Sequence, residues 1–274
     1  MKLPLDYVLG VLAECAPLGL AESWDNVGLL IAPCAEPPDV HKLLLTIDLD
    51  ERVLNEASDW GAQLIVAYHP PLFGGLKRLR ANEPGERVAV ETLRRGIFVY
   101  SPHTALDAAS GGMTDWLAGA LGAGNTRAIV PATAMGLGAQ DGDVVGAGRV
   151  VQLRQSLALK EALVAIKAHL GLSHLRVAEA ERHLRGRNIE SFAVCPGAGG
   201  SVFEKLGDVD LLLTGEMRHH DVAARVRRGT SVVLCDHTNT ERGFLPSFAE
   251  RLRGRLSGVD VRVSTQDRDP LRVV

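Results

Sequence analysis

The sequence predicts an α/β protein built from two interleaved lobes, and three observations lead to that prediction. Short apolar runs alternate with amphipathic helical stretches along most of the chain, which is typical of sheets with helices on both faces. A turn-rich stretch near the middle interrupts this alternation. The length of 274 residues, with 46% hydrophobic and 23% charged residues, suits one large domain or two lobes and excludes collagenous, disordered and coiled-coil classes.

The first part of the chain predicts strands and helices in alternation. Leu5, Val8, Leu9 and Leu12 recur at helical spacing, which predicts an amphipathic helix at the amino terminus. The expected strands are 27–32, 43–47, 63–67 and 97–100, and the expected helices are 50–60, 86–95 and 113–121.

Residues 125–189 change in character and are predicted to form a middle lobe or insertion, with 1–124 and 190–274 forming the remaining α/β lobes. The glycines that mark the change are Gly136, Gly138, Gly142, Gly146 and Gly148. Expected elements here and beyond are strands at 149–153, 191–195, 209–213 and 231–235 and helices at 156–169, 217–227 and 241–255. A single continuous sheet is the alternative.

The charge and the cysteine content indicate which binding partners and which cell compartment to expect. Thirty basic against thirty-three acidic residues give a net charge of −3, and no basic block indicates nucleic-acid binding. The four cysteines form no C-x-x-C pair, so a disulfide framework and a zinc ribbon are not expected. Charged residues near the amino terminus argue against a signal peptide, and the apolar runs are too short for a membrane-spanning helix. We therefore expect a cytoplasmic protein.

Four polar clusters directly follow predicted strands, where open α/β sheets bind ligands. They are residues 68–71, 101–107, 214–221 and 236–241. Imidazole and carboxylate groups are the ligands that divalent metals take where thiolates are absent, and His69, Asp107, His237 and Glu241 supply them. The spacing of four within His237/Glu241 and His103/Asp107 would place each pair on one helix face. Structural loops with capped histidines are the alternative interpretation.

Other polar or reactive residues receive simpler interpretations. The glycine loop 197–200 follows a strand and predicts either a phosphate-binding loop or a tight turn. Cys195 and Cys235 end apolar strands, so we expect buried small side chains and not nucleophiles. Four histidines without partners at useful spacing are expected at the surface, namely His41, His169, His174 and His183.

Five motifs in one order resemble the Nif-three-like family, also labelled type 2 GTP cyclohydrolase I. They are Glu22 to Leu29, Tyr68 to Pro71, Ser101 to Ala109, Thr214 to Glu216 with His220, and His237 with Glu241. The resemblance extends from about residue 3 to residue 250. It implies two α/β lobes with mixed sheets, a dinuclear metal centre between them, and a toroidal homohexamer whose sites face an internal cavity.

The resemblance also implies which residues bind the metal ions. The family uses two consecutive histidines, an aspartate, and a late histidine and glutamate; His69, Asp107, His237 and Glu241 match four of these positions, with Tyr68 at the fifth. A phenol titrates near pH 10 and binds divalent ions less readily than imidazole does. A firm site at His69, Asp107 and Glu241 and a weaker one at His237 and Glu241 are therefore expected, with Tyr68 optional. Zinc, manganese, iron and nickel all suit these one or two positions per subunit.

The implied activity is that of a metal-dependent hydrolase in which an activated water attacks C8 of guanine and opens the imidazole ring of GTP. His220 and His103 are candidate catalytic residues because imidazole transfers protons near neutral pH. The loop 197–200 would bind the triphosphate. Two alternatives remain open: a non-catalytic metal-binding hexamer acting as adaptor, metal chaperone or regulatory protein, which Tyr68 favours, and phosphoester hydrolysis with the same ligands.

Overall fold

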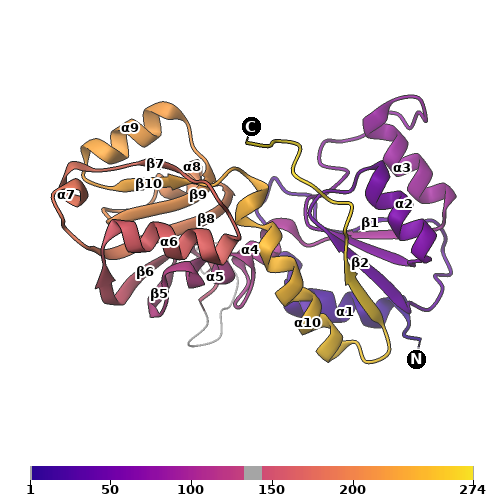
Figure 1. Cartoon of the computed structure of the whole chain (residues 1–274). Helices are drawn as coiled ribbons and strands as arrows, with labels where there is room; N and C mark the ends of the chain where they lie inside the picture. The colour runs from indigo at the N-terminus through magenta and orange to yellow at the C-terminus, as the bar shows by residue number, and fades with distance from the viewer. Residues whose placement is uncertain (1, 133–143, 274) are drawn as a thin grey trace. The chain divides into compact units, whose positions relative to one another are not determined.

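The computed structural model describes residues 2–132 and 144–273, which form two compact α/β units (Figure 1). Unit 1 comprises Met1–Leu106 and Leu245–Val274, and unit 2 comprises Asp107–Phe244. The chain therefore leaves unit 1, builds unit 2 and returns, so the predicted α/β class with interleaved lobes is confirmed. The chain passes from one unit to the other after Leu106 and after Phe244, whereas the predicted lobe boundaries were 124 and 190.

Unit 1 contains a mixed five-stranded sheet in the order β1-β4-β3-β2-β11. Its strands are β1 (Gly28–Ile31), β2 (Lys42–Thr46), β3 (Leu64–Ala67), β4 (Phe98–Ser101) and β11 (Asp260–Val263). The β4–β3, β3–β2 and β2–β11 pairs are parallel, and β1 is antiparallel to β4. The central strands β2 and β3 consist of apolar runs that are buried on both faces, as parallel strands under helices require.

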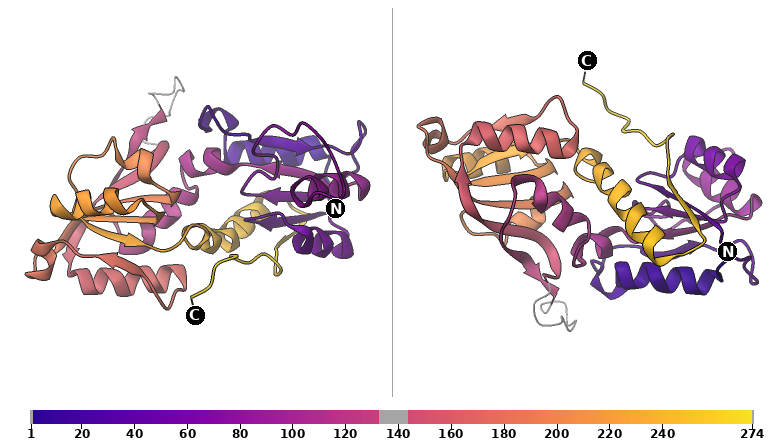
Figure 2. Two further views of the ribbon diagram at one scale, coloured as in Figure 1. Left: turned by 90° about the horizontal axis from the view of Figure 1, so that it is seen from above. Right: turned by 60° about the horizontal axis from the view of Figure 1, so that its bottom comes forward.

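Two pairs of helices cover the faces of this sheet. Helices α2 (Glu51–Trp60) and α3 (Pro84–Arg94) contribute Val53, Leu54 and Ala89 to a core with β1 to β4. Asp50 caps α2 by accepting hydrogen bonds from the amides of residues 52 and 53. Helices α1 (Leu5–Cys15) and α10 (Leu245–Arg255) run side by side, joined by an Arg255–Glu14 ion pair (Figure 2).

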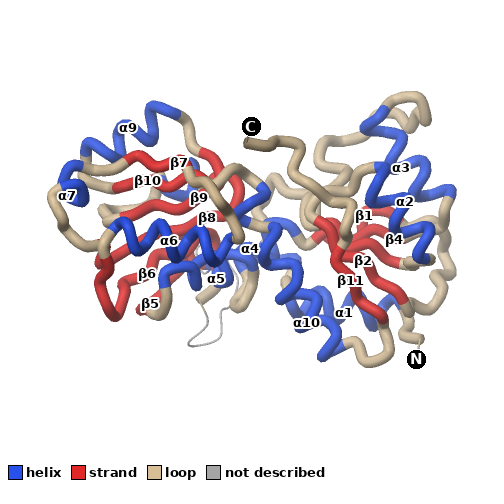
Figure 3. The backbone as a smooth tube through the Cα atoms, viewed as in Figure 1, coloured by secondary structure: helices blue, strands red, loops and turns tan. Residues whose placement is uncertain are grey.

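Unit 2 contains a mixed six-stranded sheet in the order β5-β6-β8-β9-β10-β7 (Figure 3). Its strands are β5 (Gly124–Pro131), β6 (Gly146–Leu157), β7 (Arg176–Ala178), β8 (Ile189–Ala198), β9 (Leu211–Glu216) and β10 (Ser231–Leu234). Only β8–β9 and β9–β10 are parallel pairs. The predicted middle segment 125–189 lies within this sheet, because its strands β5 and β6 continue onto β8.

Helices also cover both faces of the second sheet. Helices α5 (Met113–Ala118) and α6 (Leu159–Leu170) pack on one face around Phe192 and Leu213. Helices α8 (Gly200–Phe203) and α9 (His219–Arg227) pack on the other face around Ala193 and Leu212. The central strands of both sheets are therefore buried from two sides, and polar side chains lie at their ends and along the outer strands β5 and β6.

One buried cation stabilises unit 2. The Arg149 side chain is fully buried and pairs with Asp115, with Nε 2.5 Å from Oδ1. Its remaining nitrogens donate to five backbone carbonyls, those of Ala108, Ala109, Val144, Gly146 and Gly148. Such complete hydrogen bonding compensates the desolvation of the guanidinium.

Several sequence predictions need correction. His183, expected at the surface, is 6% exposed in α7 (Glu181–Leu184), where Ser231 lies 2.7 Å from its Nδ1. The helix expected from residue 241 begins at Leu245, after two 3-10 turns. The glycines at 136, 138 and 142 lie outside the described residues. Cys195 and Cys235 are buried and unbridged as predicted, and burial raises the pKa of the Cys235 thiol to about 12. Among the described helices none is long and apolar enough to span a membrane.

Candidate metal centre

In unit 1, His69 lies just beyond the carboxyl end of β3. Its amide donates to Ile47, 3.0 Å away, which continues the β2–β3 ladder past the strand ends. This places the imidazole Nδ1 2.9 Å from Oδ1 of Asp48, the residue that follows Ile47. A carboxylate at Nδ1 favours the tautomer with the proton there, and the lone pair then resides on Nε2. His69 thus has the outer carboxylate that metal-binding histidines usually have, and Asp48 was not predicted.

Tyr68 is 2% exposed, and its ring packs beside two imidazoles that also lie close to each other. Its ring centroid lies 5.1 Å from that of His69 and 5.4 Å from that of His103. Its carbonyl accepts a hydrogen bond from Ser101 at the end of β4. The structure therefore brings the predicted residues 68, 69 and 103 together, with Tyr68 in a packing role; metal ligation by its phenol remains a prediction.

His103 begins α4 (His103–Ala108) with a positive φ of 25° and faces a buried carboxylate. Its Nδ1 lies 2.8 Å from Oδ1 of Asp25, whose side chain is fully buried. Burial alone would raise the pKa of Asp25, but hydrogen bonds from His103 and Thr104 and the charge of His103 hold that pKa below its usual value. Asp25 therefore orients His103, a role that the sequence motif around Trp24 did not reveal.

In unit 2, His237 and Glu241 flank a single 3-10 turn, Thr238–Thr240. His237 Nε2 lies 3.5 Å from Oε1 of Glu241, and its Nδ1 lies 3.3 Å from Oε2 of Glu216 at the end of β9. Glu241 is 2% exposed, whereas the His237 side chain is 37% exposed. The pair was predicted on one face of a helix; a 3-10 turn brings it together instead.

Gly197 provides the space for this pair. It lies in β8 with φ +60°, and a Cβ there would be 2.7 Å from His237 Nε2 and 2.8 Å from Glu241 Oε1. Its amide donates to Thr240 Oγ1 at 2.8 Å, which ties β8 to the 3-10 turn. The amide of Gly199 donates to Thr214 Oγ1. Two amides of the loop expected to bind phosphate are therefore used within unit 2, and Gly197 instead forms a cradle beneath two candidate ligands.

The two remaining predicted residues, Asp107 and His220, lie in helices. Asp107 is half-buried in α4, four residues after His103 and just past the boundary between the units. His220 is exposed in the first turn of α9, where its ring packs against that of His219 with centroids 5.6 Å apart. Their assignments as metal ligand and proton-transfer residue remain predictions.

Comparisons with known proteins agree with the sequence motifs. The chain matches the family Duf34/NIF3 (NGG1p interacting factor 3) over residues 4–270. NIF3-like protein 1 of Drosophila melanogaster is 40% identical, over 98% of this chain and 89% of its own length. NGG1-interacting factor 3 of Saccharomyces cerevisiae is 39% identical, over 98% and 96%.

Solved structures show the same fold. The Bacillus cereus protein related to NIF3 aligns over 100% of both chains with a TM-score of 0.86 at 20% identity. Reduced HcgD from Methanocaldococcus jannaschii aligns over 96% of this chain and 97% of its own, with a TM-score of 0.76 at 22% identity. With a family match over nearly its whole length and relatives near 40% identity, this chain belongs to the Duf34/NIF3 family.

Proposed function

We propose that this chain is a metal-dependent hydrolase that binds divalent metal through His69, His237 and Glu241, with Asp107 as a further ligand. The observation that carries the proposal is the cradle at Gly197. Only a residue without Cβ leaves room there for an imidazole nitrogen and a carboxylate oxygen to approach each other. A buried carboxylate such as Glu241 is costly unless positive charge compensates it, which a divalent ion would do.

The donor set supports the same proposal. Imidazole nitrogen and carboxylate oxygen suit zinc, manganese, iron and nickel. His69 has its Nδ1 engaged by Asp48, and His237 has its Nδ1 towards Glu216, so both rings are oriented to offer Nε2. One or two ions per subunit, with Tyr68 as an optional ligand, remain part of the proposal.

The bound ion would polarise an electrophile and lower the pKa of a coordinated water. His103 is the better placed of the two proposed proton-transfer residues, because Asp25 fixes its Nδ1 and leaves Nε2 to exchange a proton with substrate. His220, exposed on α9, is the second candidate.

The substrate that we propose is GTP, and the proposed reaction opens the imidazole ring of its guanine. Trp24 and Phe73 are 60% and 57% exposed, and their ring centroids lie 6.2 Å and 6.1 Å from that of His103. Exposed aromatic side chains that adjoin a catalytic imidazole provide a surface on which a planar base can stack. This observation favours a purine substrate over a simple phosphoester.

A non-catalytic metal-binding adaptor is the second candidate. The yeast relative, 39% identical, carries the name NGG1-interacting factor 3, which describes a protein interaction. Tyr68 in place of a histidine is consistent with such a role. A homohexamer in the cytoplasm is proposed in either case; four cysteines that form no disulfide fit a reducing compartment.

Metal analysis and one activity assay test both candidates. We expect one to two metal equivalents per wild-type chain, loss of metal in His237→Ala and Glu241→Gln, and full metal content in the exposed control His174→Ala. Metal-loaded protein should release formate from GTP, and the His103→Gln variant should retain metal but lose turnover. Absence of turnover with Mn²⁺, Zn²⁺ and Fe²⁺ in protein that holds metal would remove the cyclohydrolase and leave the adaptor; unchanged metal content in His237→Ala would remove the site.

A further inference from the structure

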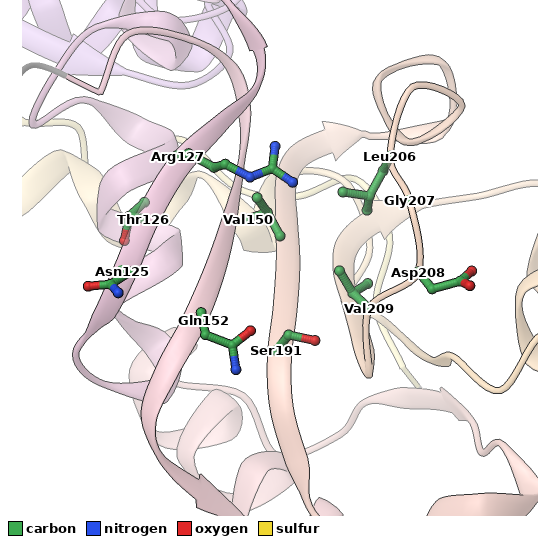
Figure 4. A pocket seen from close by; sticks show the side chains of 10 residues that line it. All are labelled: Asn125, Thr126, Arg127, Val150, Gln152, Ser191, Leu206, Gly207, Asp208 and Val209. Atoms are coloured by element: carbon green, nitrogen blue, oxygen red, sulfur yellow. The ribbon is translucent and has the colours of Figure 1, made fainter.

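A pocket of about 310 Å³ lies on the sheet of unit 2, lined by β5, β6, β8 and the loop before β9 (Figure 4). Its lining residues are Asn125, Thr126, Arg127, Val150, Gln152, Ser191, Leu206, Gly207, Asp208 and Val209. The volume is at the lower end of the range of about 300–1,000 Å³ that small-molecule sites occupy. None of these residues belongs to the candidate metal centre.

Strand register explains how the floor of the pocket forms. Asn125 pairs with Gln152, and Gln152 pairs with Ser191, so these three polar side chains form a row across three strands. Arg127 pairs with Val150 in the neighbouring row. The floor therefore offers amide and hydroxyl groups beside an apolar strip.

Hydrogen bonds hold the walls of the pocket in place. The carbonyl of Val209 accepts from Thr230 at 2.7 Å and from Arg182 at 3.1 Å. Gln152 donates to the carbonyl of Glu190 at 3.1 Å, and Ser191 is bonded to buried Asp210 through both its amide and its hydroxyl. The pocket is thus preformed, which lowers the entropic cost of binding a small ligand.

The charged side chains at the pocket form fewer hydrogen bonds and ion pairs than the residues of its walls. Within residues 2–132 and 144–273, Arg127 forms no ion pair, and its hydrogen bond to Ala128 is a long 3.5 Å. Its guanidinium extends across the strands towards Leu206, whereas Asp208 turns its carboxylate away from it (Figure 4). Exposed Arg127 therefore places one positive charge above the apolar edges of Leu206 and Val209, which belong to the core of unit 2 and are 8% and 5% exposed.

We propose that this pocket binds a small aliphatic carboxylate. The planar guanidinium of Arg127 matches a carboxylate with two parallel hydrogen bonds, and the second N–H of the Gln152 side-chain amide can add a polar contact. The aliphatic part would lie against Val150, Leu206 and Val209. Such a site is separate from any metal chemistry of the chain, so it binds its ligand whether or not metal is present.

Binding of 4-methylpentanoate, measured by calorimetry and ligand-observed NMR in the presence of EDTA, tests the proposal. EDTA removes metal ions that would bind carboxylates themselves. We expect saturable binding to the wild-type chain, with at least about tenfold weaker binding of the neutral 4-methylpentanamide and of acetate, which lacks the apolar part.

Two variants complete the experiment. Arg127→Gln should weaken 4-methylpentanoate binding at least about tenfold, whereas Arg154→Gln, which removes an exposed charge elsewhere on β6, should leave it unchanged. Glu241→Gln should also bind normally, which separates this pocket from the metal centre. Three results would overturn the proposal: no binding to the wild-type chain, equal binding of acid and amide, or full binding by Arg127→Gln. The comparison of acid with amide uses only the wild-type chain, so it does not depend on whether a variant folds.

Discussion

Replacing Gly197 by alanine is the sharpest test of the candidate metal centre. The new Cβ would lie 2.7 Å from His237 Nε2 and 2.8 Å from Glu241 Oε1, closer than carbon and these atoms can approach. At least one of the two side chains must therefore move. A displaced ligand no longer meets the metal at bonding distance, and we expect metal affinity to fall by about tenfold to a hundredfold, as it does when the partners of ligands are lost.

The same substitution also strains the backbone. Gly197 has φ +60°, where an alanine costs about 1–2 kcal/mol. Gly171 is a matched control because it has φ +68° at the end of α6 but open space around its Cβ position. Gly171→Ala should lose similar backbone energy and keep wild-type metal affinity.

Metal affinity is measured by competition with a chromogenic chelator, and stability by thermal unfolding of the metal-free proteins. We expect both variants to unfold at lower temperature, by about 2–4 °C for each kcal/mol, with only Gly197→Ala impaired in metal binding. If Gly197→Ala binds metal as the wild type does, His237 and Glu241 do not hold the ion in the arrangement described, and the cradle has only a structural role.

Three other predictions each concern one side chain. Asp48→Asn should weaken metal binding about tenfold or more because it loses the charge that orients His69, with Glu36→Gln as an exposed acidic control; equal affinities would contradict that role. Arg149→Met should lower the free energy of unfolding by about 3–5 kcal/mol in urea titrations, since Oδ1 of Asp115 and five carbonyls lose the guanidinium donor, whereas Arg154→Met should be near neutral. Burial, assisted by the charge of Arg182, lowers the pKa of His183 below 6.5. The unfolded chain therefore binds more protons than the folded chain, and the free energy of unfolding should fall as the pH falls below 6.5. His183→Gln should flatten this pH dependence, and an unchanged slope would show that His183 does not cause it.

Sequence patterns predicted the elements with continuous apolar runs best. Strands β2, β3, β9 and β10 lie within a few residues of their predicted ranges, because parallel strands buried on both faces need such runs. The missed strands lie at sheet edges. β5 mixes exposed and buried residues, and β7 has only three residues, so neither carries a strong periodic signal.

The candidate site was predictable only in part, for a related reason. His69, His103, His237 and Glu241 were predicted because they follow strands in the chain, and unit 1 and unit 2 each bring their own members together. Their orienting partners Asp25, Asp48 and Glu216 belong to other strands or loops, and the sequence does not show which histidine each of them contacts. Asp48 follows β2 just as His69 follows β3, so applying the strand-end argument to every strand would have found it.

Gly197 shows where sequence reasoning misreads a residue type. A glycine after a strand suggests a phosphate loop or a turn, since both exploit exposed amides or positive φ. Here the amide is already bonded to Thr240, and the missing side chain matters more than the backbone. The absence of a Cβ leaves space on the strand surface where two polar groups from a distant turn can converge. A glycine whose amide is bonded, and whose Cβ would collide with candidate ligand atoms, is therefore a better indicator of a binding site than a glycine-rich motif alone.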